Sequence, residues 1–176
     1  MLRSRGLTLI EVLAAVMILS IGVVVYGALQ TRAMGTAMNA NKAQIADSIL
    51  VSLADKIRIN STNQSTLSKR QQILNEYLSY NWNAKENCLV MPQAIKACSY
   101  ILGNSARCDS SKMVMFDAYT SKCSSNSLLK ETSLAARQCP SSENICLYYA
   151  WDGAAANDIV CDDVNSTCTV LEVFVK

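Results

Sequence analysis

A long apolar stretch close to the N-terminus limits what this chain can fold into more than any other feature of its sequence. It runs from Leu7 to Leu29, 23 residues that include a single charged side chain, Glu11. As a helix it would be ~34 Å long, enough to cross the hydrocarbon core of a bilayer. Two basic residues, Arg3 and Arg5, precede it, which favours a cytoplasmic N-terminus. The sequence therefore predicts a single-pass, membrane-embedded helix at the start of the chain.

Two simpler interpretations of this stretch are a cleavable secretory signal peptide and a plain signal anchor. A signal peptide has a shorter apolar region that ends at a small-residue cleavage site, whereas this stretch is longer and no break follows it. A plain anchor explains the length, but neither interpretation explains Glu11. An ionisable side chain inside an apolar span is costly and by default indicates a function.

The residues around this carboxylate resemble the class III signal of type IV prepilins and pseudopilins. The matching segment, Arg5 to Val12, has the sequence RGLTLIEV. The resemblance implies that a prepilin peptidase cuts between Gly6 and Leu7 and then N-methylates the new terminus at Leu7. Members of the family usually have Phe or Met where this chain has Leu7, which is a mild departure.

The resemblance also implies an assembly role for Glu11. Cleavage would leave a positive amine at Leu7, and in this family the carboxylate is thought to meet the terminal amine of a neighbouring subunit. Paired, both charges are tolerated in an apolar core, whereas one alone is not. Cleavage would also remove Arg3 and Arg5, which lowers the 16 Lys and Arg residues to 14, equal to the 14 Asp and Glu residues. Such a neutral chain lacks the positive charge that attracts nucleic acid.

Beyond the apolar stretch, residues 30–60 have the pattern of an amphipathic helix. Apolar side chains recur every four residues at Ile45, Ile49, Leu53 and Ile57. We therefore predict one helix over residues 7–60, with residues 7–29 in the membrane or filament core and residues 30–60 packed on a globular domain.

Two glycines, Gly22 and Gly27, interrupt the apolar half of this helix. Each lowers helix stability by up to ~1 kcal/mol relative to Ala. Small residues also permit close helix approach in membranes. We predict that these two positions give the helix local flexibility in a filament.

All 8 cysteines lie between Cys88 and Cys168, and this density indicates a disulfide-stabilised region outside the cytoplasm. The absence of any C-x-x-C pair argues against zinc ribbons and thioredoxin-like sites. Eight cysteines allow about 105 connectivities. The favoured local pairs are Cys139–Cys146 and Cys161–Cys168. Four cysteines stay unassigned: Cys88, Cys98, Cys108 and Cys123.

Residues 61–176 are long enough for one modest domain. Apolar periodicity predicts helices at 68–80 and at 127–137, the second ending before Pro140. Segments rich in β-branched and aromatic residues predict strands at 144–151 and 167–175. We therefore expect an α+β fold of the type IV pilin kind, in which a long N-terminal helix packs on an antiparallel sheet with disulfide-stabilised loops.

The composition argues against catalysis and against a bound cofactor or metal. The chain has no His, which excludes Ser-His-Asp and Cys-His mechanisms. Four residues could gather oxygen ligands for calcium but lack the order of an EF-hand loop. They are Asp158, Asp162, Asp163 and Asn165. We expect a solvated acidic loop there, no cofactor, and a protein that is not an enzyme.

The N-terminal helix is similar to that of minor pilins of the PilV type in two places. One is Ile21-Gly22 followed by Gly27-Ala-Leu-Gln30, and the other is the helix end at 54–60. The resemblance implies a minor pilin that primes type IV pilus assembly, lies at or near the tip, and supports twitching motility, adhesion or DNA uptake. Its partners would be the prepilin peptidase, other minor pilins, the major pilin and the inner-membrane assembly platform.

Two alternatives stay open. A type II secretion pseudopilin has the same leader and helix, and a tip adhesin would bind a surface ligand directly. In each case the protein would be in the inner membrane of a Gram-negative bacterium before assembly, and a pilus subunit would then reach the cell surface.

Overall fold

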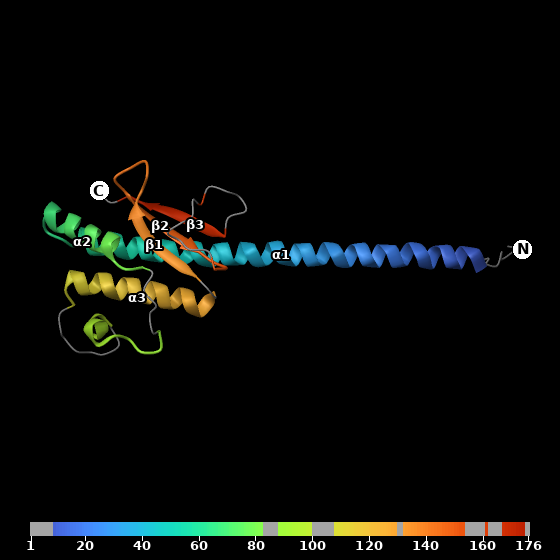
Figure 1. Cartoon of the computed structure of the whole chain (residues 1–176), viewed down its shortest axis with the longest axis horizontal. Coiled ribbons are helices and arrows are strands. Elements are labelled where there is room, and N and C mark those ends of the chain that lie inside the picture. Colours follow the sequence, from blue (N-terminus) through green and yellow to red (C-terminus); the bar gives the residue numbers. More distant parts are fainter. Residues whose placement is uncertain are drawn as a thin grey trace, which may run out of the picture. The chain divides into compact units, whose positions relative to one another are not determined.

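The computed structural model describes residues 9–82, 88–99, 108–129, 132–153, 161 and 167–174 (Figure 1). The chain divides into two compact units, Met1–Asn41 and Lys42–Lys176. We call them the N-terminal unit and the head unit. The first helix, α1 (Leu9–Thr62), is 54 residues long and contributes to both. The remaining described helices and strands belong to the head unit.

Side-chain caps mark the passage from α1 to α2 (Leu67–Ser79). The backbone N–H of Asn63 still donates to the Ile59 carbonyl, and the Gln64 side-chain amide donates to the Asn60 carbonyl at 3.0 Å. Thr66 then caps α2, because its hydroxyl oxygen accepts from the backbone N–H of Lys69. The helix predicted at 68–80 is therefore confirmed.

The part of α1 in the head unit buries one face. The residues that share this face are less than one-tenth exposed, and they are Ala46, Ile49, Leu50, Leu53, Ala54 and Ile57. Three of the four positions predicted from the four-residue period, all but Ile45, are in this set, and Ile45 is partly buried beside it. This face packs in the same core as Tyr77 of α2 and Val114 of α3 (Ser110–Leu128).

Three antiparallel strands form the sheet in the order β1-β2-β3. They are β1 (Ser133–Gln138), β2 (Ile145–Ala150) and β3 (Cys168–Val173). Leu147 of β2 lies opposite Ala136 of β1 and Leu171 of β3, and all three contact the core that includes α1. The two strands predicted from β-forming residues correspond to β2 and β3.

One secondary-structure prediction is wrong. The segment predicted as a helix at 127–137 contains the end of α3 and all of β1 except its last residue, Gln138. Its Leu134 and Ala136 are buried in the core, and Ala136 pairs with Leu147 of β2. Strand pairing and burial therefore outweigh the helical propensity of its alanines.

A further difference from the sequence prediction is the helix α3, which was missed. Asp109 begins it by accepting the backbone N–H of Lys112 on its Oδ1 at 2.8 Å. A short 3-10 helix, η1 (Gln93–Cys98), packs against α3. The whole is an α+β fold, with a long N-terminal apolar helix, a small antiparallel sheet and four disulfides.

Candidate functional site

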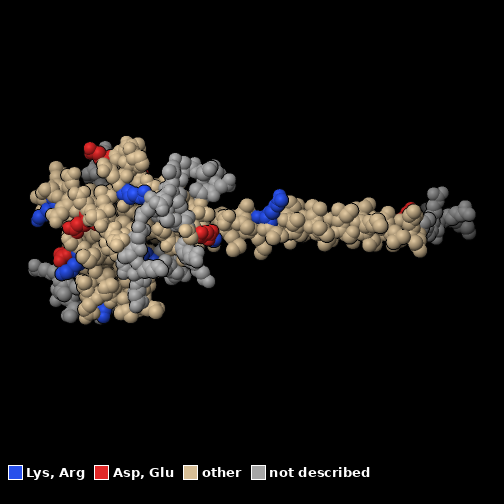
Figure 2. Space-filling view, viewed as in Figure 1, with Lys and Arg blue, Asp and Glu red and all other residues tan. Residues whose placement is uncertain are grey.

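The described surface of the N-terminal unit is apolar. The large apolar side chains from Leu9 to Leu29 are each between 49% and 79% exposed. Across residues 9–41 the charged residues are Glu11 and Arg32. In Figure 2 the charged side chains accordingly gather over the head unit. By length and composition α1 is able to cross a membrane, and its most apolar window buries nothing within the chain. An exposed apolar surface of this extent is typical of a surface that contacts a membrane or another protein.

The structure places Glu11 in the first turn of α1. A carboxylate there is compatible with the positive end of the helix dipole. The predicted cleavage and methylation positions, Gly6 and Leu7, lie outside the described residues.

The two glycines of the apolar helix contact no other part of the described chain. A Cβ added at Gly22 or Gly27 would meet no described heavy atom beyond its own stretch of helix within 4 Å. The helix continues through both, and the Thr31 hydroxyl donates to the Gly27 carbonyl at 2.8 Å. Flexibility in a filament stays a prediction.

Four disulfides join every cysteine of the head unit. They are Cys88–Cys123, Cys98–Cys108, Cys139–Cys146 and Cys161–Cys168. The last two are the local pairs favoured from spacing. Cys139–Cys146 closes the β1–β2 hairpin, and Cys161–Cys168 holds the start of β3. Cys88–Cys123 fastens the chain before η1 to α3, and Cys98–Cys108 joins the end of η1 to the residues just before α3.

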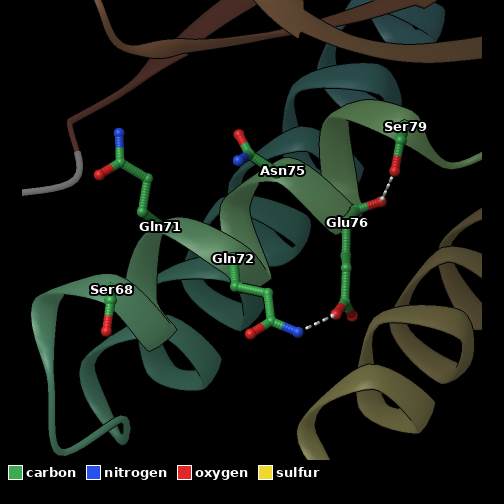
Figure 3. A pocket seen from close by; sticks show the side chains of 6 residues that line it. All are labelled: Ser68, Gln71, Gln72, Asn75, Glu76 and Ser79. Carbon is green, nitrogen blue, oxygen red and sulfur yellow. Dashed lines mark hydrogen bonds between the residues drawn. The ribbon is translucent and has the colours of Figure 1, made fainter.

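An open hollow on α2 is lined by polar side chains, of which all but one are neutral (Figure 3). Its lining residues are Ser68, Gln71, Gln72, Asn75, Glu76 and Ser79. Glu76 is the only acid among them and accepts from the Gln72 amide at 3.4 Å and from the Ser111 hydroxyl at 3.0 Å. Within the described ranges, no three His, Cys, Asp or Glu side chains are placed to hold a metal. The candidate calcium residues Asp158, Asp162, Asp163 and Asn165 lie outside those ranges.

A buried group of polar side chains joins α1, α2 and α3, and sequence reasoning missed it. We call Asn60, Tyr77 and Asp117 the polar junction. The Tyr77 hydroxyl donates to Asp117 Oδ2 at 2.6 Å, and the Asn60 amide donates to the Tyr77 hydroxyl at 3.2 Å. Burial raises the pKa of Tyr77 and also that of Asp117. The only sign of this junction in the sequence was Asp117, an isolated acidic residue in a segment without a continuous apolar stripe.

Comparison with protein families identifies the start of the chain. Residues 1–26 match the prokaryotic N-terminal methylation motif. The matched segment contains Gly6, Leu7 and Glu11, and the motif supports a type IV pilin-like prepilin. It implies processing by a prepilin peptidase and membrane association. No curated protein and no solved structure matches the chain.

Proposed function

We propose that this protein is a minor pilin of the type IV pilus. It primes pilus assembly at the inner membrane, lies at or near the tip, and supports twitching motility, adhesion or DNA uptake. Its partners are the prepilin peptidase, the assembly platform, other minor pilins and the major pilin. The PilV-type features between Ile21 and Asn60 support this subclass over the other prepilin-like proteins.

One observation supports the assembly role above all. A methylation motif leads directly into a helix whose large apolar side chains from Leu9 to Leu29 are exposed and whose first turn carries Glu11. Such a surface needs apolar partners before and after assembly. The bilayer covers it before assembly, and neighbouring subunits cover it in the filament.

The proposal assigns the protein to assembly and not to catalysis. The chain has no His, and its side chains carry no net charge once Arg3 and Arg5 are removed. We therefore expect protein contacts to dominate, with no general affinity for nucleic acid. The mature protein belongs to the inner membrane of a Gram-negative bacterium, with its N-terminus cytoplasmic, and then to the pilus on the cell surface.

Deletion of the gene tests the proposal most broadly. We expect loss or reduction of surface pili and of twitching, with exoprotein release unchanged. Normal piliation with blocked exoprotein release would overturn it in favour of a type II secretion pseudopilin, which shares the leader and helix. Normal pili that fail to adhere would instead indicate a tip adhesin.

A pair of substitutions tests the assembly role of Glu11. In Glu11→Val the terminal amine of a neighbour loses its partner, and breaking a buried ion pair costs about 3–5 kcal/mol. Incorporation into pili should then fall by ~100-fold or more. Glu11→Asp, which keeps the charge, is the matched control and should retain much of the incorporation. Wild-type incorporation of Glu11→Val, measured by immunoblot of sheared pili at equal membrane expression, would contradict the role.

A further inference from the structure

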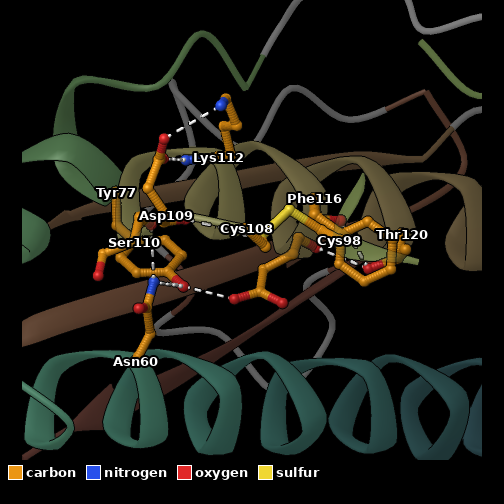
Figure 4. The surroundings of a disulfide bond; sticks show 10 residues. Asn60, Tyr77, Cys98, Cys108, Asp109, Ser110, Lys112, Phe116 and Thr120 are labelled. Atoms are coloured by element: carbon orange, nitrogen blue, oxygen red, sulfur yellow. Dashed lines mark hydrogen bonds and ion pairs between the residues drawn. A yellow bond between two sulfur atoms is a disulfide. The ribbon is translucent and has the colours of Figure 1, made fainter. Parts of the chain in front are cut away.

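The three side chains of the polar junction are almost fully buried although they are polar. Such burial costs free energy unless hydrogen bonds offset it. Tyr77 is 0% exposed, Asp117 4% and Asn60 7%. Besides its bond to Tyr77, the Asn60 amide also donates to the Ser110 carbonyl at 3.2 Å (Figure 4). The junction therefore fastens the end of α1 to α2 and to the first turn of α3.

Among the described residues, no ion pair to the carboxylate at the centre of this junction is found. Lys56 of α1 acts on Asp117 through space, while its Nζ donates to the Thr120 hydroxyl at 3.0 Å. Burial raises the pKa of Asp117, and the Tyr77 hydrogen bond and Lys56 only partly oppose that rise. Burial likewise lowers the pKa of Lys56, with Asp117 opposing.

The other elements packed near Asp117 also carry charged groups, and most of these groups contact residues other than Asp117. Glu76 of α2 acts on Tyr77 and accepts from Ser111. Lys96 lies on η1, which packs against α3. On the sheet, Arg137 lies over the Tyr148 ring and Glu172 accepts from Ser142 and Asn144. On α3 itself, Lys112 pairs with Asp109, and Lys122 lies over the Tyr80 ring.

We propose that the polar junction is an acid-sensitive clamp on the end of α1, closing more firmly when the Asp117 carboxyl is protonated and loosening when it is ionised. A neutral carboxylic acid can share the Tyr77 hydroxyl without the cost of a buried charge. Among the described residues, an ionised carboxylate in the same place has one hydrogen-bond donor, the Tyr77 hydroxyl, and Lys56 acts on it only through space, so opening of the clamp to water becomes easier. The inference does not depend on the role of the protein in a pilus.

The sign of the pH dependence follows from linkage. The pKa of Asp117 in the folded protein lies above its ordinary value. Its stabilising contribution is therefore fully present below that ordinary value and is lost as the pH rises through the folded pKa. Asp109 and Glu172 have lowered pKa values because hydrogen bonds favour their ionised forms, so their contributions change in the opposite direction.

Hydrogen–deuterium exchange of the full-length protein in detergent micelles tests the clamp. Protection of peptides covering 54–62 and 110–120, corrected for intrinsic exchange, would be followed from about pH 4 to about pH 8. We expect protection to fall ~10-fold for each unit by which the folded pKa exceeds the unfolded one. In Asp117→Asn, which keeps an acceptor for Tyr77 but cannot ionise, this fall should disappear. Asp109→Asn, an exposed acid at the start of the same helix, is the control and should retain it.

The same pH profile in wild type and Asp117→Asn would overturn the proposal. If the variant does not fold, the carboxyl carbon of Asp117 can be titrated directly by NMR in the wild-type protein. A titration at or below the ordinary value of an aspartate would then overturn it, and a titration clearly above that value would support it.

Discussion

The N-terminal unit and the head unit treat their apolar side chains in opposite ways. In the first, residues such as Leu19 and Val24 are more than two-thirds exposed, and the unit contains no cysteine. In the second, Leu53, Ile57 and Leu147 are fully buried, and four disulfides join the surrounding elements. The first unit depends on its surroundings to cover it, whereas the second supplies its own core.

The difference indicates two environments for one continuous helix. Within α1 the apolar side chains pass from a surface that faces outward on all sides to a stripe that faces one core. A substitution that removes apolar volume should therefore have a cost that depends on the unit in which it is made. The following predictions test that contrast.

The largest effect is expected from truncating the buried face of α1. Leu53→Ala removes a fully buried side chain and should lower the free energy of unfolding of the head unit by about 2–5 kcal/mol. Leu19→Ala, on the 68%-exposed surface of the same helix, is the matched control and should leave it unchanged. Trp82 and Trp151 are both buried, so tryptophan fluorescence during thermal unfolding reports the transition. Equal destabilisation by both variants would contradict the difference in burial between the two units.

Disulfide removal should also destabilise the head unit, by an amount that depends on the length of the loop. Cys88 and Cys123 are 35 residues apart, so replacing both by Ser should cost about 4 kcal/mol. Cys139 and Cys146 are 7 apart and close a hairpin, so the same change should cost about 2 kcal/mol. Chemical denaturation of the two double variants measures the difference. The reverse order would show that the bridges act through native packing and not through the unfolded chain.

The smallest effect is expected at the glycines of the N-terminal unit. Gly22→Ala should stabilise α1 by up to about 1 kcal/mol in the isolated protein, because no atom of another described segment lies within 4 Å of a Cβ there. Hydrogen exchange of the flanking amides in micelles measures this gain. In pili the same variant should assemble less well if the helix must bend or approach a neighbour closely. Unchanged assembly would show that Gly22 has no such role.

Strong, regular patterns made much of the fold predictable. The apolar period gave α1, and β-branched and aromatic runs gave β2 and β3. The helix α3 was missed because its inward side includes the polar residues Asp117, Ser121 and Lys122, which break the apolar stripe. The strand β1 was mistaken for helix because its alanines favour helices, and only its pairing with β2 shows otherwise.

Some features of the candidate site could likewise be predicted from local sequence patterns, whereas others depend on contacts between residues distant in sequence. The motif at Gly6, Leu7 and Glu11 is contiguous, so the sequence alone could identify it. The pairs Cys139–Cys146 and Cys161–Cys168 are close in sequence and could be guessed. Cys98–Cys108, 10 residues apart, is local as well but was left unassigned, whereas Cys88–Cys123, 35 residues apart, depends on tertiary packing. The polar junction combines residues from three helices, and no local pattern brings them together.

The central claim is that one chain combines a processed, membrane-embedded helix with an oxidised head unit. Intact-mass spectrometry of the mature protein, with and without reduction, tests both halves at once. The account predicts a chain that begins at Leu7 with one added methyl group and that lacks one hydrogen for each of its 8 cysteines. Retention of residues 1–6, removal of the whole apolar stretch, or eight free thiols would contradict it.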